Sequence, residues 1–148
     1  MSDYVIQKTN LKFDETKLVQ RNLKKILLII LHHTASLSGD AYSIHKDHLK
    51  RGWAGIGYHY LILQDGTIQE GRPIKYVGSH CAGNNTSSIG IALLGDFRKV
   101  KPTKEQIDAL NLLVNMLKER VPSIYKVLNH NDLYATACPV VNLKELVK

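Results

Sequence analysis

The hydrophobic pattern predicts four strands in the first two thirds of the chain. Residues 25–33 read KILLIILHH, a continuous apolar run that ends in two histidines and is typical of a strand buried on both faces. Residues 88–94, SIGIALL, form a second run of this kind. Residues 58–64 and 67–70 resemble strands and flank the dipeptide at 65–66, Asp-Gly, which favours a hairpin turn. We therefore expect two central strands and one hairpin.

Two further stretches have helical periodicity. Residues 40–51 predict a short amphipathic helix that Gly52 closes. Residues 103–120 predict a longer helix, and in it Thr103 and Gln106 have the spacing of a capping box. The residues expected to face the core from this helix are Ile107, Leu110, Val114 and Leu117.

A short strand at residues 126–129 and a terminal amphipathic turn at 143–147 complete the pattern. Strands interspersed with helices predict an α/β fold, a single domain with a central mixed β-sheet flanked by helices. The chain has 148 residues, a length typical of one domain. We expect this domain to span residues 24–148, with residues 1–23 as an N-terminal segment that packs on it.

The net charge and the hydropathy pattern limit the kinds of partner that the protein is expected to bind. The chain has a formal net charge of +7, which favours an anionic partner such as a nucleic acid, a membrane surface or an acidic cell wall. The basic residues are scattered and no nucleic-acid-binding motif accompanies them, so no nucleic acid is expected. The apolar run at 26–31 is too short to cross a bilayer, and no membrane partner is expected. Residues 1–13 lack the features of a secretory signal, so we expect synthesis to end in the cytoplasm.

Most of the seven histidines are expected to have no metal-binding role. His45 and His48 lie three apart in the first predicted helix and share a face, but an exposed polar face is a better interpretation than a metal site. His59 lies between Tyr58 and Tyr60, so on a strand it points away from both tyrosines and is expected to be packed or hydrogen-bonded.

The adjacent pair His32-His33 is more informative. Successive residues of a strand point to opposite faces, so only one of the two histidines can enter a given site, and spacing alone does not say which. His130 and Cys138 stand eight residues apart in a predicted loop. This spacing can hold zinc, but it also suits a cysteine nucleophile with a histidine base, or a buried cysteine and a core histidine.

Five segments in fixed order resemble a known family. They read LHHTAS at 31–36, HLKRGWAGIGYHYLI at 48–62, DGTIQEGRP at 65–73, VGSHCAGNNTSSIGIALLGDF at 77–97 and NHNDLYATACP at 129–139. Together they resemble the N-acetylmuramoyl-L-alanine amidases of the small phage-lysin type, which share a fold with animal peptidoglycan recognition proteins. The resemblance covers about residues 24–146. It implies hydrolysis of the amide bond between N-acetylmuramic acid and L-alanine in bacterial peptidoglycan.

The resemblance also implies a zinc cofactor and a set of site residues. The metal ligands of the family correspond to His32, His130 and Cys138. The catalytic tyrosine of the family corresponds to Tyr58. Two residues before the cysteine, many phage members have a catalytic lysine, whereas this chain has Thr136, as is common in recognition proteins with amidase activity. Thr136 is therefore the second candidate catalytic residue, as a further hydrogen-bond donor to the oxyanion beside Tyr58. Two imidazoles and a thiolate leave one tetrahedral position free, as in catalytic zinc sites.

For other residues of the matched segments, the resemblance gives a less definite role. His80 corresponds to a position on the wall of the substrate groove and is a candidate substrate-binding residue, with packing inside the protein as the alternative. Cys81 has no matching role and is expected to be a buried small residue. A glycosidase is disfavoured because it generally needs two facing carboxylates, and no pairing is evident among the acidic candidates Asp65, Glu70, Asp96 and Asp132.

Two other functions stay open beside the phage or prophage endolysin that the resemblance favours. One is a catalytically inactive peptidoglycan-binding module, although all three ligand positions are filled here. The other is a cytosolic wall-recycling amidase, which Cys138 disfavours because that branch usually has aspartate as its third ligand. We expect a monomer that acts on the wall after release. Some relatives of this kind also bind a viral polymerase, so a contact with a phage or host RNA polymerase stays open.

Overall fold

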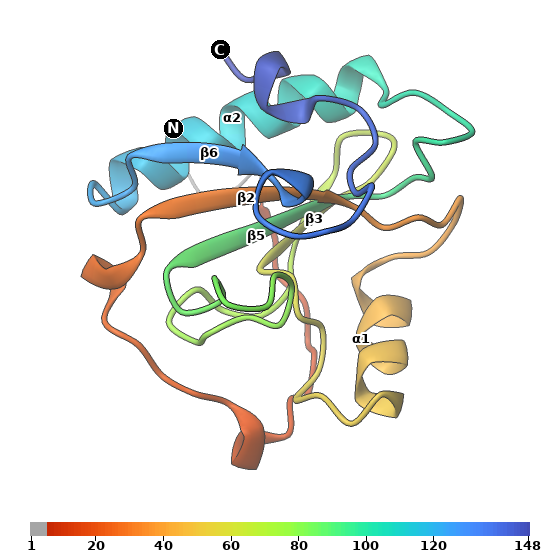
Figure 1. Ribbon diagram of the computed structural model, residues 1–148. Helices are drawn as coiled ribbons and strands as arrows, with labels where there is room; N and C mark the ends of the chain where they lie inside the picture. The colour runs from red at the N-terminus through yellow and green to blue at the C-terminus, as the bar shows by residue number, and fades with distance from the viewer. Residues whose placement is uncertain (1–5) are drawn as a thin grey trace.

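A computed structural model describes residues 6–148 and contains one mixed sheet of six strands. In spatial order the strands run β1-β4-β3-β5-β2-β6. Figure 1 labels β2, β3, β5 and β6. Only β3 and β4 are antiparallel, and every other neighbouring pair is parallel. The predicted fold class is therefore confirmed. In chain order the strands are β1 Ile6–Gln7, β2 Leu28–His33, β3 Tyr60–Ile62, β4 Ile68–Glu70, β5 Ser88–Leu93 and β6 Lys126–Asn129.

Helix α2, Lys104–Arg120, covers one face of the sheet (Figure 1). Thr103 begins it with the predicted capping box, in which Thr103 Oγ1 accepts from the Gln106 backbone N–H and Gln106 Oε1 accepts from the Thr103 backbone N–H. The helix packs Leu110, Leu113, Val114 and Leu117 against strand residues such as Ile29, Leu31, Ile89, Ile91 and Leu93.

The predicted core face of α2 needs one correction. Ile107 is only half-buried, whereas Gln106 is 1% exposed. The physical reason is that Gln106 Nε2 donates to the carbonyl oxygens of Ile62 and Leu94, which lie at the ends of two neighbouring strands. A polar side chain is buried here because it provides a donor to the carbonyl of Leu94 and a second donor to the carbonyl of Ile62, which also accepts the backbone N–H of Leu94.

Helix α1, Ala41–Lys50, lies on the opposite side of the sheet (Figure 1). Asp40 caps it, and Gly52 follows it with a φ of +88°, a backbone conformation that glycine adopts readily. A second apolar cluster forms here from Ala41, Ile56, Leu61, Ala92 and Leu94. Neither helix of the described residues is long and apolar enough to cross a membrane.

The interpretation of His45 and His48 as an exposed polar face is wrong. Each is 6% exposed. His45 Nδ1 accepts the backbone N–H of Ile56 at 3.0 Å, and His48 Nδ1 accepts that of Gly57 at 2.9 Å. The two histidines are buried because segment 54–58 folds back over α1, and its backbone donors need acceptors. Both side chains are hydrogen-bonded to backbone groups.

Residues 6–25 run across the domain as an extended segment with two short 3-10 turns, Glu15–Lys17 and Leu23–Lys25. The Asp14 backbone N–H donates to the carbonyl of Ala54, and the side chain of Arg21 donates to the carbonyls of Ile74, Asn85 and Ser88. The predicted domain boundary between residues 23 and 24 stays a prediction. Residues 1–5 of the predicted N-terminal segment lie outside the described residues.

Candidate metal centre and active site

Parallel strand pairing brings two histidines together at the carboxyl end of the sheet. His32 is the last residue but one of β2, and β6 ends at Asn129, directly before His130. In the β2–β6 register Leu31 is paired with Asn129, so His130 follows at the level of His32. The ring centroids of the two histidines are 4.4 Å apart. The carboxyl ends of parallel strands are where sites in such sheets usually form.

Strand alternation decides between His32 and His33. Ile29 and Leu31 belong to the core beneath α2, so His33 lies on that face too, and its Nδ1 accepts the backbone N–H of Phe97 at 3.1 Å. His32 therefore points to the other face, together with Ala92 of β5. This is the choice that residue spacing left open.

Cys138 approaches the same point from the loop after β6. Its Sγ lies 3.9 Å from His32 Nδ1, and it accepts the backbone N–H of His33 at 3.4 Å. One ligand atom from each of His32, His130 and Cys138 can be chosen so that all three lie within 4.8 Å of one another. The structure thus brings the three predicted ligands together in one cluster that can hold a metal ion.

The chemistry of these residues fits a metal. His130 Nδ1 is buried, and none of residues 6–148 provides it with a hydrogen-bond partner. Burial lowers the pKa of His32 and of His130, which keeps both imidazoles in the neutral form that binds metals. Burial raises the pKa of the Cys138 thiol to about 11, so a metal must displace its proton. Two neutral imidazoles and one thiol are a donor set typical of zinc.

The two predicted catalytic groups lie beside this cluster. The ring of Tyr58 is 5.2 Å from that of His32, and burial raises the pKa of Tyr58, so its hydroxyl stays protonated and can donate. Thr136 Oγ1 accepts the backbone N–H of Cys138 at 3.2 Å, which leaves the hydroxyl proton of Thr136 available for another partner. Both side chains line a cavity of about 680 Å³ that includes all three predicted ligands.

His80 also lines the cavity but is engaged within the protein. Its Nδ1 lies 2.9 Å from His32 Nε2, and its Nε2 lies 3.3 Å from the hydroxyl of Ser88. The predicted contact between His80 and substrate stays a prediction. Cys81 is 2% exposed, as expected for a buried small residue. His59 is fully buried, and its Nδ1 accepts the backbone N–H of Gly90, which confirms the interpretation of a hydrogen-bonded histidine.

No aspartate or glutamate is among the described residues that line this cavity. The four acidic residues considered from the sequence have other partners: Asp65 accepts from Thr67, Glu70 pairs with Lys8, Asp96 with Arg98 and Asp132 with Lys144. The paired carboxylates of a glycosidase are therefore missing from this cavity.

Sequence reasoning did not single out several other side chains of the cavity wall. Arg51 lies 5.6 Å over the ring of Trp53 and pairs with Asp47 at 3.0 Å. Tyr134 stacks on His130 at 5.6 Å between ring centroids. Trp53 is the only tryptophan of the chain and lies within a matched segment, which is a signal that could have drawn attention to it.

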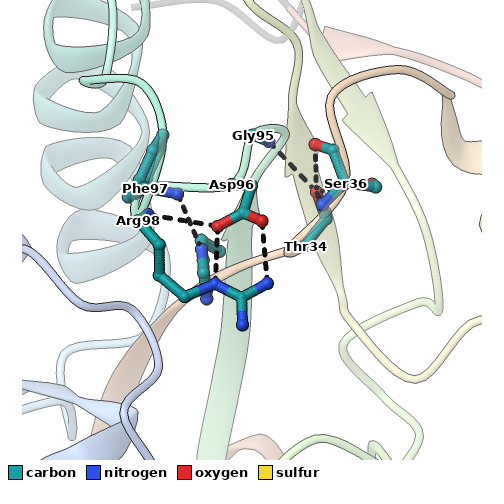
Figure 2. A network of polar contacts seen from close by, with 7 residues as sticks. Thr34, Ser36, Gly95, Asp96, Phe97 and Arg98 are labelled. Atoms are coloured by element: carbon teal, nitrogen blue, oxygen red, sulfur yellow. Dashed lines mark hydrogen bonds and ion pairs between the residues drawn. The ribbon is translucent and has the colours of Figure 1, made fainter.

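A polar network fixes the loops that leave β2 and β5 at the cavity edge (Figure 2). Thr34 Oγ1 accepts from the Gly95 backbone N–H and from the Ser36 hydroxyl, each at 3.0 Å. Asp96 accepts from both Nε and Nη2 of Arg98, at 2.8 and 2.7 Å, and this contact lowers the pKa of Asp96. The two loops are joined, and Thr34 and Arg98 line the same cavity as His32, His130 and Cys138.

Comparison with known proteins identifies the family. The family profile described as N-acetylmuramoyl-L-alanine amidase matches residues 22–140. The chain belongs to this family. It is 34% identical over 119 residues to an endolysin of Enterobacteria phage K11, which covers 77% of this chain and 78% of that protein. It is 33% identical over 140 residues to a peptidoglycan-recognition protein of Drosophila melanogaster, which covers 86% of this chain and 76% of that protein.

A solved structure agrees with the sequence comparisons. The N-acetylmuramoyl-L-alanine amidase LysC from Clostridium intestinale URNW superposes with a TM-score of 0.87 at 34% identity, which covers 97% of this chain and 98% of that chain. The resemblance, the fold and the amidase activity predicted from the sequence are confirmed. The protein is a peptidoglycan amidase whose family hydrolyses the bond between N-acetylmuramic acid and L-alanine.

Proposed function

We propose that the amidase is zinc-dependent and that His32, His130 and Cys138 bind one zinc ion. The observation that carries the proposal is the cluster of these three side chains, with ligand atoms within 4.8 Å of one another, in the cavity of about 680 Å³ in an amidase fold. The buried, unpartnered Nδ1 of His130 supports it, because a buried polar nitrogen without a partner is costly unless a ligand satisfies it.

A bound zinc ion supplies a Lewis acid that activates water and polarises a carbonyl group. In this proposal the chain's own residues do the rest. Tyr58, held protonated by burial, donates a hydrogen bond to the oxyanion that develops on the attacked carbonyl. Thr136 adds a second donor, and its oxygen meanwhile accepts the Cys138 backbone N–H, which fixes the hydroxyl beside the ligand. The amide group attacked is the lactyl carbonyl of muramic acid, as the family implies.

Product analysis after digestion of purified peptidoglycan tests the proposal. We expect free L-alanine amino termini to be released, with no new reducing sugar ends. A strong chelator is expected to abolish the release, and added zinc to restore it. New reducing ends, or new amino groups on the third residue of the stem peptide, would contradict the choice of bond. Full activity in protein shown by elemental analysis to be free of metal would contradict the zinc dependence.

The rival mechanism is a cysteine nucleophile with a histidine base. A reactive cysteine usually has a lowered pKa, whereas burial raises the pKa of Cys138. Cys138 also lies near two histidines, His32 and His130, whose ring centroids are 4.4 Å apart. A cysteine nucleophile needs only one histidine base, whereas a metal site uses both. A chelator separates the two mechanisms, because it inhibits a metal enzyme and leaves a cysteine hydrolase active.

We further propose that the protein acts as a phage or prophage endolysin on bacterial peptidoglycan. One support is its 34% identity to the endolysin of phage K11. The other is Cys138, because the wall-recycling branch usually has aspartate at this position. The inactive peptidoglycan-binding module is disfavoured because all three ligand types are present in one cluster. Three further expectations stay predictions: the protein is a monomer, it has no nucleic-acid or membrane partner, and it could also contact a phage or host RNA polymerase.

A further inference from the structure

Behind His32, three polar groups form a hydrogen-bonded chain within the protein. His32 Nε2 lies 2.9 Å from His80 Nδ1, and His80 Nε2 lies 3.3 Å from the hydroxyl oxygen of Ser88. The Ser88 hydroxyl lies 2.6 Å from the backbone oxygen of Asn84. Ser88 is fully buried and His80 is 9% exposed, so water is largely excluded from these bonds.

The chain ends on a carbonyl oxygen, which can only accept, and this fixes the direction of every bond in it. Ser88 donates its single hydroxyl proton to Asn84, so the Ser88 oxygen accepts from His80 Nε2–H. A neutral His80 protonated on Nε2 has a bare Nδ1, which accepts from His32 Nε2–H. His32 Nδ1 is then unprotonated, and it is the atom that lies 3.9 Å from Cys138 Sγ.

The backbone around His80 is built to hold this ring. A Cβ on Gly90 would meet His80 Cγ at 2.5 Å, so the ring fits only because residue 90 lacks a side chain. Asn85 Oδ1 accepts the backbone N–H of His80 at 2.9 Å. Arg21 in turn donates to the carbonyls of Asn85 and Ser88, which joins the N-terminal segment to the loop that carries His80.

We propose that His80 is a positioning residue for the metal centre, which together with Ser88 holds His32 in the tautomer whose bare Nδ1 faces Cys138. This role rests on the proposed zinc site. Partners behind a histidine ligand fix the orientation and tautomer of its ring, and their loss typically weakens metal binding about 10–100-fold. The role differs from a substrate contact, because both ring nitrogens of His80 already have partners within the protein.

Zinc affinity, measured by competition with a chelating dye, tests the proposal without any assay of activity. We expect His80→Leu to weaken zinc binding about 10–100-fold. His80→Asn retains an oxygen that can accept from His32, so it is expected to recover part of the affinity. Ser88→Ala removes only the acceptor behind His80 and is expected to weaken zinc binding less. Cys81→Ala changes the neighbouring residue of the same loop and is the matched control, with unchanged affinity expected.

A nitrogen-15 NMR spectrum of the metal-free protein reports the tautomer directly. We expect His32 to be protonated on Nε2 in the wild type, and to become a mixture of tautomers in Ser88→Ala. Unchanged zinc affinity in correctly folded His80→Leu overturns the role, and if that variant does not fold, Ser88→Ala decides in the same way. A raised KM for peptidoglycan with unchanged zinc affinity assigns His80 to substrate instead. If the wild-type protein binds no zinc, the proposed zinc dependence itself is wrong. The titration of the wild type reports that outcome separately from the titrations of the variants.

Discussion

At the scale of single residues, the two neighbouring histidines at the end of β2 provide the sharpest test of the metal centre. We expect His32→Ala to lose its zinc and its activity, because two remaining ligands do not hold the ion tightly. His33→Ala is the matched control, since that side chain lies on the α2 face and accepts the Phe97 backbone N–H. It is expected to keep its zinc while losing some stability. Elemental analysis of both purified variants decides, and the opposite pattern would move the ligand to His33.

Tyr58 gives a second prediction at this scale. We expect Tyr58→Phe to fold and to bind zinc as the wild type does, but to turn over about a hundredfold more slowly, the usual effect of losing one oxyanion donor. The reason is that the substitution removes only the hydroxyl, which burial keeps protonated. Turnover is measured on purified peptidoglycan, with zinc content as the control. Unchanged turnover would transfer the donor role to Thr136 or to solvent.

Residue types and spacing indicated the site but could not assign all of it. The adjacent letters His32-His33 do not tell which side chain joins the cluster with His130 and Cys138, because that depends on which face of the sheet α2 covers. The misinterpretation of His45 and His48 has a similar cause. Their neighbours in the helix are polar, but segment 54–58 covers them, and a local pattern carries no information about a distant segment.

At the scale of elements, Gln106 joins the beginning of α2 to the sheet. Its Nε2 donates to the carbonyls of Ile62 and Leu94, and its Oε1 completes the capping box with Thr103. We expect Gln106→Leu to lower the free energy of unfolding by about 2–4 kcal/mol, because the Leu94 carbonyl and the Thr103 N–H lose their partner and the Ile62 carbonyl loses one of its two donors. Lys104→Ala, an exposed change in the same helical turn, is expected to alter it by less than about 0.5 kcal/mol. Urea unfolding measures both, and equal effects would contradict the prediction.

Element types followed well from the sequence, but element lengths did not. Strand β3 covers only Tyr60–Ile62, whereas the pattern predicted 58–64. Beyond the two strands, His59 still donates its backbone N–H to the carbonyl of Gly90, and the backbone N–H of Arg72 donates to the carbonyl of Tyr58. Arg72 is 3% exposed and also donates to the carbonyls of Gly55, Ile56 and Val77. The side chain of this buried arginine binds loop carbonyls beside the beginning of β3, and no periodicity in the sequence predicts such a contact.

At the scale of the whole molecule, the fold contains several histidines that are buried in the neutral form. Burial lowers the pKa of His59 to about 3 and that of His48 to about 4, well below the ordinary value of 6.5. The unfolded chain therefore binds more protons than the folded chain between about pH 6.5 and these lower values. The stability that these groups contribute is fully present above pH 6.5 and is lost as the pH falls towards 4.

His48 allows this acid sensitivity to be measured at one position. Besides burial, the charge of Arg51 and then that of Arg72 oppose its protonation, while Asp47 favours it, and protonation of Nδ1 would break its bond with the Gly57 N–H. We expect the free energy of unfolding of metal-free protein to fall between pH 6.5 and 4.5 by up to about 1.4 kcal/mol per pH unit for each such histidine. His48→Asn keeps an acceptor for Gly57 but does not titrate, so its slope is expected to be shallower by up to one proton. Urea titrations at pH 7.0, 5.5 and 4.5 give both slopes. Equal slopes in the two proteins would show that His48 is protonated in the folded state already.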